Sequence, residues 1–146
     1  MFEVDPELIG RYEAAVYRVW DEDELITFRI DKPNPDLDRL LDTHDTRMAA
    51  FITAHNPGSK VLSPADNDLA HEQLLDELRN SGLCWQAGVG VDAKGEWKPE
   101  TSVMVFGIDR RISTALAGQF RQNAYVWIQR GEPPRLVWTG PSRSSS

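Results

Sequence analysis

The chain has very little cysteine, no excess of basic residues and no long apolar run. Cys84 is the only cysteine among 146 residues, so the chain can form neither an internal disulfide nor a site of several thiolates for a metal ion. Its neighbours Leu83 and Trp85 predict a strand with a packed thiol. Lysine and arginine number 16 against 23 acidic residues, and the net charge of −7 disfavours general attraction to nucleic-acid phosphates. Nucleic acid is therefore not an expected partner.

Other absences narrow the class of protein further. The apolar stretches fall short of the roughly 20 residues that a membrane helix needs, so we expect no membrane partner. The first residues lack the basic and apolar segments of a secretion leader, and we expect a cytoplasmic location. The three histidines, His44, His55 and His71, show no metal-ligand spacing. We expect neither a metal nor a cofactor.

What the chain does contain is enough apolar material for one folded domain. Hydrophobic residues make up 40% of the sequence and charged residues 27%, which are ordinary values for a globular protein. A length of 146 residues is typical of a single domain. We therefore expect one α+β domain over residues 1–140. The polar run over residues 141–146 is predicted to be a disordered tail.

Apolar spacing and turn residues predict seven strands and four helices. The strands are expected over residues 15–20, 25–30, 49–54, 83–91, 102–108, 124–129 and 136–138. Short helices are expected over residues 6–12 and 36–41, and longer ones after Ser63 and after Asp109, because both residues are good helix caps. Five apolar residues at helical spacing should face the sheet: Leu74, Leu78, Ile112, Leu116 and Phe120.

The order of these elements predicts a topology. From residue 49 onward it is strand, helix, strand, strand, helix, strand, the split βαβ (βαββαβ) pattern of ferredoxin-like folds. With right-handed crossovers the strand order is 124–129, 49–54, 102–108 and 83–91. The strands 49–54 and 102–108 should be antiparallel neighbours in the middle of the sheet. An N-terminal hairpin, the last strand and short helices add to this core.

The predicted strand directions bring four polar or glycine-rich segments to one edge of the sheet. They are His55 with Asn56, the run 88–92, the run 100–102, and Gln122 with Asn123. Trp97 stands in the loop before the third of these segments. Because the four segments are far apart in the sequence, their convergence at one edge indicates a candidate site.

The same segments resemble a bacterial family of single small domains of unknown function. The resemblance rests on Ile-Thr-Ala-His-Asn-Pro at 52–57, on Trp-Lys-Pro-Glu-Thr-Ser at 97–102, and on Gln-Asn-Ala-Tyr-Val-Trp at 122–127. It runs from about Tyr12 to Trp127. Members often have an aromatic residue at the position of His55. The resemblance implies a small domain of this kind and carries no activity.

The sequence does not identify the function, and three hypotheses stay open. The first is a small binding module for a polar or anionic, nucleotide-like ligand at the converging edge. Its candidate ligand-binding residues are His55, Asn56, Trp97, Glu100, Ser102, Gln122 and Asn123. The others are an enzyme that uses Glu100 or His55 as acid or base, and a protein-interaction domain or homodimer. The same carboxylate and amides also suit a hydrogen-bond network that only ties the strand ends together.

Overall fold

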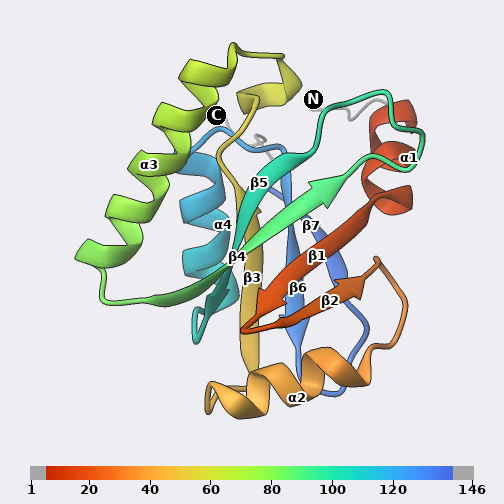
Figure 1. Ribbon diagram of the computed structural model, residues 1–146, viewed down its shortest axis with the longest axis vertical. Helices are drawn as coiled ribbons and strands as arrows, with labels where there is room; N and C mark the ends of the chain where they lie inside the picture. Colours follow the sequence, from red (N-terminus) through yellow and green to blue (C-terminus); the bar gives the residue numbers. More distant parts are fainter. Residues whose placement is uncertain (1–5, 140–146) are drawn as a thin grey trace.

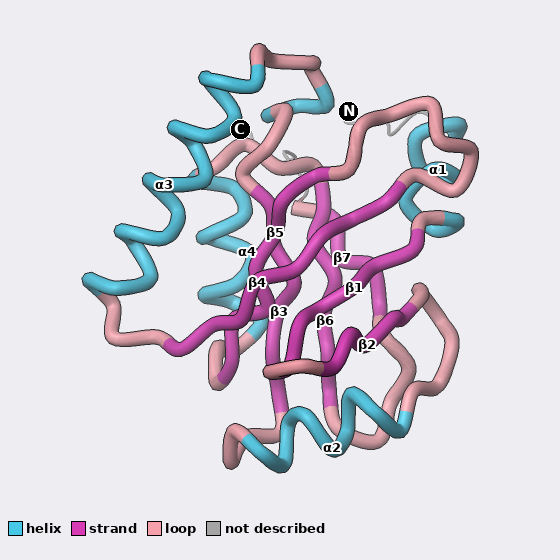
Figure 2. The backbone as a smooth tube through the Cα atoms, in the orientation of Figure 1, coloured by secondary structure: helices cyan, strands magenta, loops and turns pink. Residues whose placement is uncertain are grey.

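Seven antiparallel strands form one sheet in the computed structural model, which describes residues 6–139 (Figures 1 and 2). The strand order is β2-β1-β4-β5-β3-β6-β7. The strands are β1 (Val16–Asp21), β2 (Glu24–Phe28), β3 (Met48–Thr53), β4 (Cys84–Val91), β5 (Glu100–Phe106), β6 (Ala124–Gln129) and β7 (Arg135–Trp138). The predicted tail over residues 141–146 lies outside the described part of the chain.

Within residues 6–139, four α-helices accompany the sheet, so the chain is of mixed α+β class as expected. They are α1 (Pro6–Ala14), α2 (Pro35–Thr43), α3 (Pro64–Asn80) and α4 (Arg110–Gln119). Both predicted caps are confirmed: the Ser63 hydroxyl accepts a hydrogen bond from the Asp66 N–H at 3.1 Å, and Asp109 accepts one from the Ile112 N–H at 2.8 Å. Over residues 6–139, none of the helices combines the length and apolarity of a membrane span.

The middle of the sheet has the pairing that the element order predicted. Strands β3 and β5 are antiparallel neighbours, with Thr53 opposite Ser102. Strand β6 lies on the other side of β3, and β4 lies beyond β5. The N-terminal hairpin β1–β2 continues the sheet past β4, and β7 continues it past β6. This pairing brings the end of β3 beside the start of β5.

The sheet is strongly curled, because residues from distant strands meet on its inner face. Four strand positions separate β2 from β3, yet the rings of Phe28 and Phe51 lie 5.2 Å apart. The loop after β2 also approaches the turn before β7: the Asp31 N–H donates to the Pro134 carbonyl at 2.8 Å. The sheet therefore wraps around an inner apolar core.

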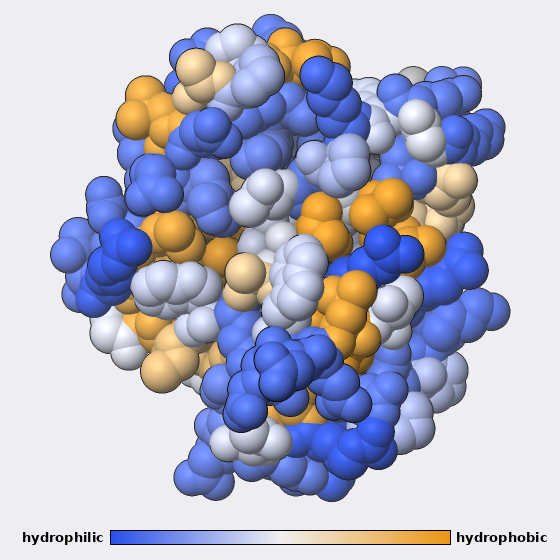
Figure 3. Space-filling model, in the orientation of Figure 1, coloured by the Kyte–Doolittle hydropathy of each residue, from blue (hydrophilic) through white to orange (hydrophobic). Residues whose placement is uncertain are grey.

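Helices α3 and α4 cover the outer face of β3, β5 and β6, where they form a second core (Figure 1). Leu74, Leu78 and Leu116 are buried there, as predicted, and Phe120 packs against the same cluster. These helices do not cover the β1–β2 hairpin, where Trp20 and Leu25 stand opposite each other and stay 45% and 46% exposed. Figure 3 shows apolar surface near the middle of this view, over β1 and β4.

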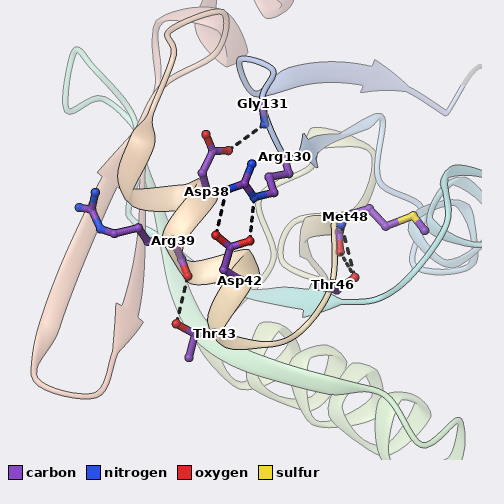
Figure 4. A network of polar contacts seen from close by, with 8 residues as sticks. All are labelled: Asp38, Arg39, Asp42, Thr43, Thr46, Met48, Arg130 and Gly131. Carbon is purple, nitrogen blue, oxygen red and sulfur yellow. Dashed lines mark hydrogen bonds and ion pairs between the residues drawn. The ribbon is translucent and has the colours of Figure 1, made fainter.

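Helix α2 closes one end of the inner core. Its three leucines, Leu37, Leu40 and Leu41, are all buried against the inward residues of the sheet. The Arg130 guanidinium clamps the Asp42 carboxylate with two hydrogen bonds of 2.7 and 2.9 Å (Figure 4). The Gly131 N–H donates to Asp38 at 2.9 Å. Helix α2 is thus fastened to the turn after β6.

The prediction for Ile112 was wrong, because α4 packs on a slightly different face. Ile112 is 46% exposed, whereas Ser113 and Ala117 are fully buried. Residues 113, 116, 117 and 120 recur at three- and four-residue spacing and form the packed stripe. Small residues in that stripe let the helix lie close to β3 and β6.

The prediction of a packed Cys84 was also wrong, since this thiol is exposed. Strand β1 pairs only with residues 88–91 of β4. The first half of β4 therefore has no neighbouring strand on that side, and Cys84 at its start is left open to solvent.

Replacing Leu78 by alanine should lower the unfolding free energy by about 2–5 kcal/mol, because the side chain is fully buried between α3 and the sheet. Ile112→Ala is the matched control, and its effect should stay within about 0.5 kcal/mol. Urea denaturation of both variants tests the helix packing. A loss below about 1 kcal/mol for Leu78→Ala would mean that α3 docks differently.

Candidate functional site

A cavity of about 90 Å³ lies at the end of the inner core opposite α2. Its walls come from the inward face of the sheet, from α1 and from the loop between β4 and β5. Helix α1 lies beside the end of β4 and the start of the β1 strand, near this loop (Figure 1). No residue of α1 is fully buried, so this helix covers the core without filling it as α2 does.

Aromatic side chains form the inner wall of the cavity. Tyr17 and Phe51 line it, and their ring centroids are 5.7 Å apart. Phe28 packs beneath both, 5.6 Å from Tyr17. Phe51 reaches this place only because Gly88 has no side chain: a Cβ there would lie 2.4 Å from the Phe51 ring and 2.7 Å from the Arg18 carbonyl oxygen.

Glu100 and Ser102 enter the cavity from β5. The strand begins at Glu100, two residues earlier than predicted, and alternation places both residues on the inner face with Met104. The Ser102 hydroxyl donates to the backbone carbonyl of Glu100 at 2.9 Å. The proton of the Ser102 hydroxyl is used in this hydrogen bond. The Glu100 carboxylate is the ionisable group that β5 contributes to the cavity.

Asn56 holds that carboxylate from the loop after β3. Its side-chain oxygen accepts hydrogen bonds from the Leu62 N–H at 3.0 Å and from the Asn67 amide at 2.9 Å. Because the Leu62 N–H can only donate, the Asn56 oxygen must face it and the Asn56 nitrogen must face Glu100. That nitrogen donates to Oε2 of Glu100 at 2.9 Å. The amide thus joins the loop, α3 and β5.

Burial raises the pKa of Glu100, and the hydrogen bond from Asn56 opposes this shift only in part. Within the described residues, no lysine or arginine forms an ion pair with this carboxylate. Its second oxygen, Oε1, accepts no hydrogen bond from the same residues. A carboxylate in this position lacks the positive partner that buried charges normally have.

The mouth of the cavity is built around Arg11. Its guanidinium lies over the Trp97 ring, 4.9 Å from the ring centre, and hydrogen-bonds to Glu96 at 3.3 Å. It also lies 3.7 Å from Asp92. Burial disfavours the charge of Asp92, but the backbone N–H groups of Glu96 and Trp97, with Arg11, outweigh it and lower the Asp92 pKa. Two carboxyl groups of one cavity therefore have pKa values shifted in opposite directions.

Residues 52–125, just over half of the chain, match the family described as protein of unknown function (DUF3293). The chain belongs to this family. Comparisons with curated proteins and with solved structures gave no match. The matched region of DUF3293 carries the Asn56–Glu100 contact, whereas α1 and the β1–β2 hairpin lie before it. The expectation of a small domain family of unknown function is confirmed.

Of the seven residues proposed from sequence, five line the cavity of this DUF3293 chain: Asn56, Trp97, Glu100, Ser102 and Gln122. Gln122 serves the frame of the cavity, because its side-chain nitrogen donates to the carbonyls of His55 at 3.0 Å and Phe120 at 3.3 Å. The hydrogen-bond network that the sequence analysis gave as an alternative is therefore present around Asn56 and Gln122. That any of the five binds a ligand stays a prediction.

His55 and Asn123 lie outside the lining. The His55 ring packs edge-on against His71 at 6.1 Å, and burial lowers the pKa of both imidazoles. The Asn123 carbonyl accepts a hydrogen bond from the Thr139 N–H at 3.0 Å, which joins β6 to the residue after β7. Among the described residues, no group of three or more His, Cys, Asp or Glu side chains is placed to hold a metal ion.

Several lining residues were not among the seven candidates: Arg11, Tyr12, Tyr17, Phe51 and Asp92, the last of which ends the run 88–92 predicted at this edge. Alternation in β1 marked Tyr17 as inward-facing, whereas β3 is apolar on both faces and gave no such signal for Phe51. The sequence pattern did not predict that one end of the inner core contains a cavity. The position of α1 depends on contacts such as the Tyr17 hydroxyl donating to the Tyr12 carbonyl at 2.8 Å.

Gly88→Ala should lower the unfolding free energy by about 1–3 kcal/mol, because the new methyl group meets both the Phe51 ring and the backbone of β1. Gly90→Ala provides the control two residues away, where a Cβ would make ordinary contact with Tyr17 at 3.6 Å. Chemical denaturation measures both. Equal effects at the two glycines would contradict the close approach of Phe51 to Gly88.

Asn56→Ala should lower the unfolding free energy by about 1–3 kcal/mol, because the Leu62 N–H and the Asn67 amide lose the oxygen to which they donate. Asn56 also has a φ of 49°, which alanine adopts poorly.

Glu100→Gln should keep or raise the stability at neutral pH, since a glutamine oxygen still accepts from Asn56 and the desolvated charge is gone.

The pH dependence of the Glu100→Gln effect has a definite sign. A raised folded-state pKa means that Glu100 stabilises the fold below its unfolded pKa and loses this contribution as the pH rises through the folded value. The advantage of Glu100→Gln should therefore shrink between neutral pH and roughly pH 4. Urea melts at both pH values test it, and a marked loss of stability in Glu100→Gln at neutral pH would contradict it.

Proposed function

We propose that this chain is a binding module for a small amphipathic molecule, which enters the cavity between α1 and the sheet and places its polar end at Glu100. One observation carries the proposal: Asn56 holds the Glu100 carboxylate in an aromatic-lined cavity, and no basic residue in the described part of the chain pairs with it. Such a carboxylate weakens the fold, so its position suits recognition better than stability. A concave, mostly apolar site with few polar groups is also the usual form of a ligand pocket.

The size and charge of the cavity narrow the ligand. Pockets for drug-sized ligands measure roughly 300–1,000 Å³, so a cavity of about 90 Å³ suits a small molecule or one end of a longer one. An anionic group such as a nucleotide phosphate would meet the Glu100 carboxylate at the inner wall. A neutral or cationic hydrogen-bond donor fits this position better.

Enzymatic acid–base chemistry is a second candidate function, favoured by the opposite pKa shifts of Glu100 and Asp92. Carboxyl groups whose environments push their pKa values apart often supply the acid and the base of a reaction. An enzyme of this kind would lose turnover in Glu100→Gln while its fold stays intact. Glu100 fits the acid or base of this alternative better than His55, because the His55 residue lies outside the cavity lining.

We also propose that the unit from β3 to β6 is a split βαβ core of the ferredoxin-like kind. The strand order β4-β5-β3-β6 and the packing of α3 and α4 on one face support this assignment. The β1–β2 hairpin and β7 then count as additions, and the curl that they complete encloses the cavity.

A fragment screen by NMR tests the binding proposal. Small fragments at millimolar concentration should shift the backbone amide signals of Tyr17, Gly90, Ser102 and Ala124, which line the cavity on four different strands. The amides of α3 serve as the internal control and should not move. Fragments that bind only elsewhere, or a library without any hit at these four amides, would contradict the proposal.

A further inference from the structure

The charge of Glu100 sets a clear requirement for any molecule that occupies the cavity. Oε2 accepts a hydrogen bond from Asn56, while Oε1 accepts none from the described residues. The free oxygen therefore needs a donor, and the carboxylate needs a positive charge when the occupant excludes water from it. A neutral donor meets the first need only.

The basic side chains that line the cavity do not supply this charge. Arg11 lies at the mouth, where it contacts Glu96, Asp92 and the face of Trp97, although its Nη1 has no hydrogen-bond partner among the described residues. Lys98 also belongs to the lining, but it is exposed to solvent. It forms no ion pair within the described residues. Within residues 6–139, no basic side chain is therefore paired with Glu100, and a bound cation would supply that partner.

The aromatic wall adds a second, independent preference for a cation. Tyr12, Tyr17, Phe51 and Trp97 all line the same cavity as Glu100. Aromatic faces attract cations and also bury the apolar body of a ligand. The Arg11 guanidinium over Trp97 is an example of this attraction at the mouth of the same cavity.

Resting on the binding function proposed above, we infer that the ligand is a small protonated amine with a short aromatic or aliphatic body. Its ammonium group donates a hydrogen bond to Oε1 of Glu100, and its body packs against Tyr17 and Phe51. A primary or secondary amine fits better than a quaternary one, because Oε1 requires an N–H donor. Carboxylates and phosphates of the same size should bind more weakly at this position, because their charge repels that of Glu100.

Four probes that share a phenyl ring but differ in their polar group test the inference: benzylamine, benzyl alcohol, benzoate and benzyltrimethylammonium. Each is titrated into the full chain at neutral pH, and the amide signals of the cavity lining are followed by NMR. Benzylamine should bind at least about tenfold more tightly than benzyl alcohol and benzoate, as a charge-assisted hydrogen bond implies. Benzyltrimethylammonium should fall between benzylamine and the alcohol.

Glu100→Gln should remove this preference for the amine, while the alcohol binds as before. Glu132→Gln is the matched control, because it also removes one negative charge but alters an exposed residue in the β6–β7 turn. Benzylamine affinity should also fall as the pH drops below neutral in the wild-type chain, because protonation of Glu100 removes the charge that the ammonium needs. The Glu100→Gln variant should lack this pH dependence.

The outcomes separate this inference from the proposed function. Equal or tighter binding of benzyl alcohol or benzoate in the cavity overturns the amine inference and leaves the binding function standing. So does a fragment screen whose cavity hits include no amine. A screen without any cavity hit removes the binding function itself. The wild-type comparison of benzylamine with benzyl alcohol decides the inference independently of the stability of either variant.

Discussion

The hydrogen bond from Asn56 to Glu100 connects the frame of the protein to its cavity. On one side of this contact, Asn56 is fixed by the Leu62 N–H and by Asn67 of α3. On the other side, Glu100 begins β5 and looks into the cavity. Because the backbone donor of Leu62 dictates the direction of the Asn56 amide, the position of the carboxylate follows from the loop geometry. The acid is therefore placed by the fold before any ligand arrives.

The two ends of the inner core explain why the cavity lies where it does. Helix α2 fills one end with three buried leucines and is clamped by the Arg130–Asp42 contact. Helix α1 covers the other end without burying any of its residues. The curl that brings β2 towards β3 requires Phe51 to lie over Gly88, and this packing forms the floor beneath the unfilled end. The cavity is thus the part of the inner core that α1 covers but does not fill.

Local patterns predicted much of this arrangement. The element order, with right-handed crossovers, predicted that β3 and β5 are antiparallel neighbours, and hence the convergence of Asn56, Glu100 and Gln122. The orientation of helix α4 about its axis was predicted less well. The apolar spacing that starts at Ile112 suggested one buried face, but the helix buries the face with Ser113 instead. The spacing argument did not consider the small side chain of Ser113. Helical phase depends on which side chains the sheet can accept, and one sequence does not contain this information.

The contribution of α1 was beyond sequence reasoning for a different reason. Its residues show no buried stripe, so periodicity does not assign it a partner surface. Its position depends on long-range contacts of Arg11 with the β4–β5 loop and of Tyr12 with Tyr17 and Trp138. The polar edge was thus foreseen, whereas the aromatic wall and the cover that turn it into a cavity were not.

The most direct test of this account is the titration of the Glu100 carboxyl by NMR of the side-chain carbon. The account predicts a pKa above the ordinary range of a glutamate, since burial without a basic partner disfavours the charged form. It also predicts that the pKa of Glu100 falls when benzylamine is added, because a bound ammonium stabilises the carboxylate. An ordinary or lowered pKa in the free protein would mean that Glu100 already has a positive partner or lies in water, and it would contradict the central claim.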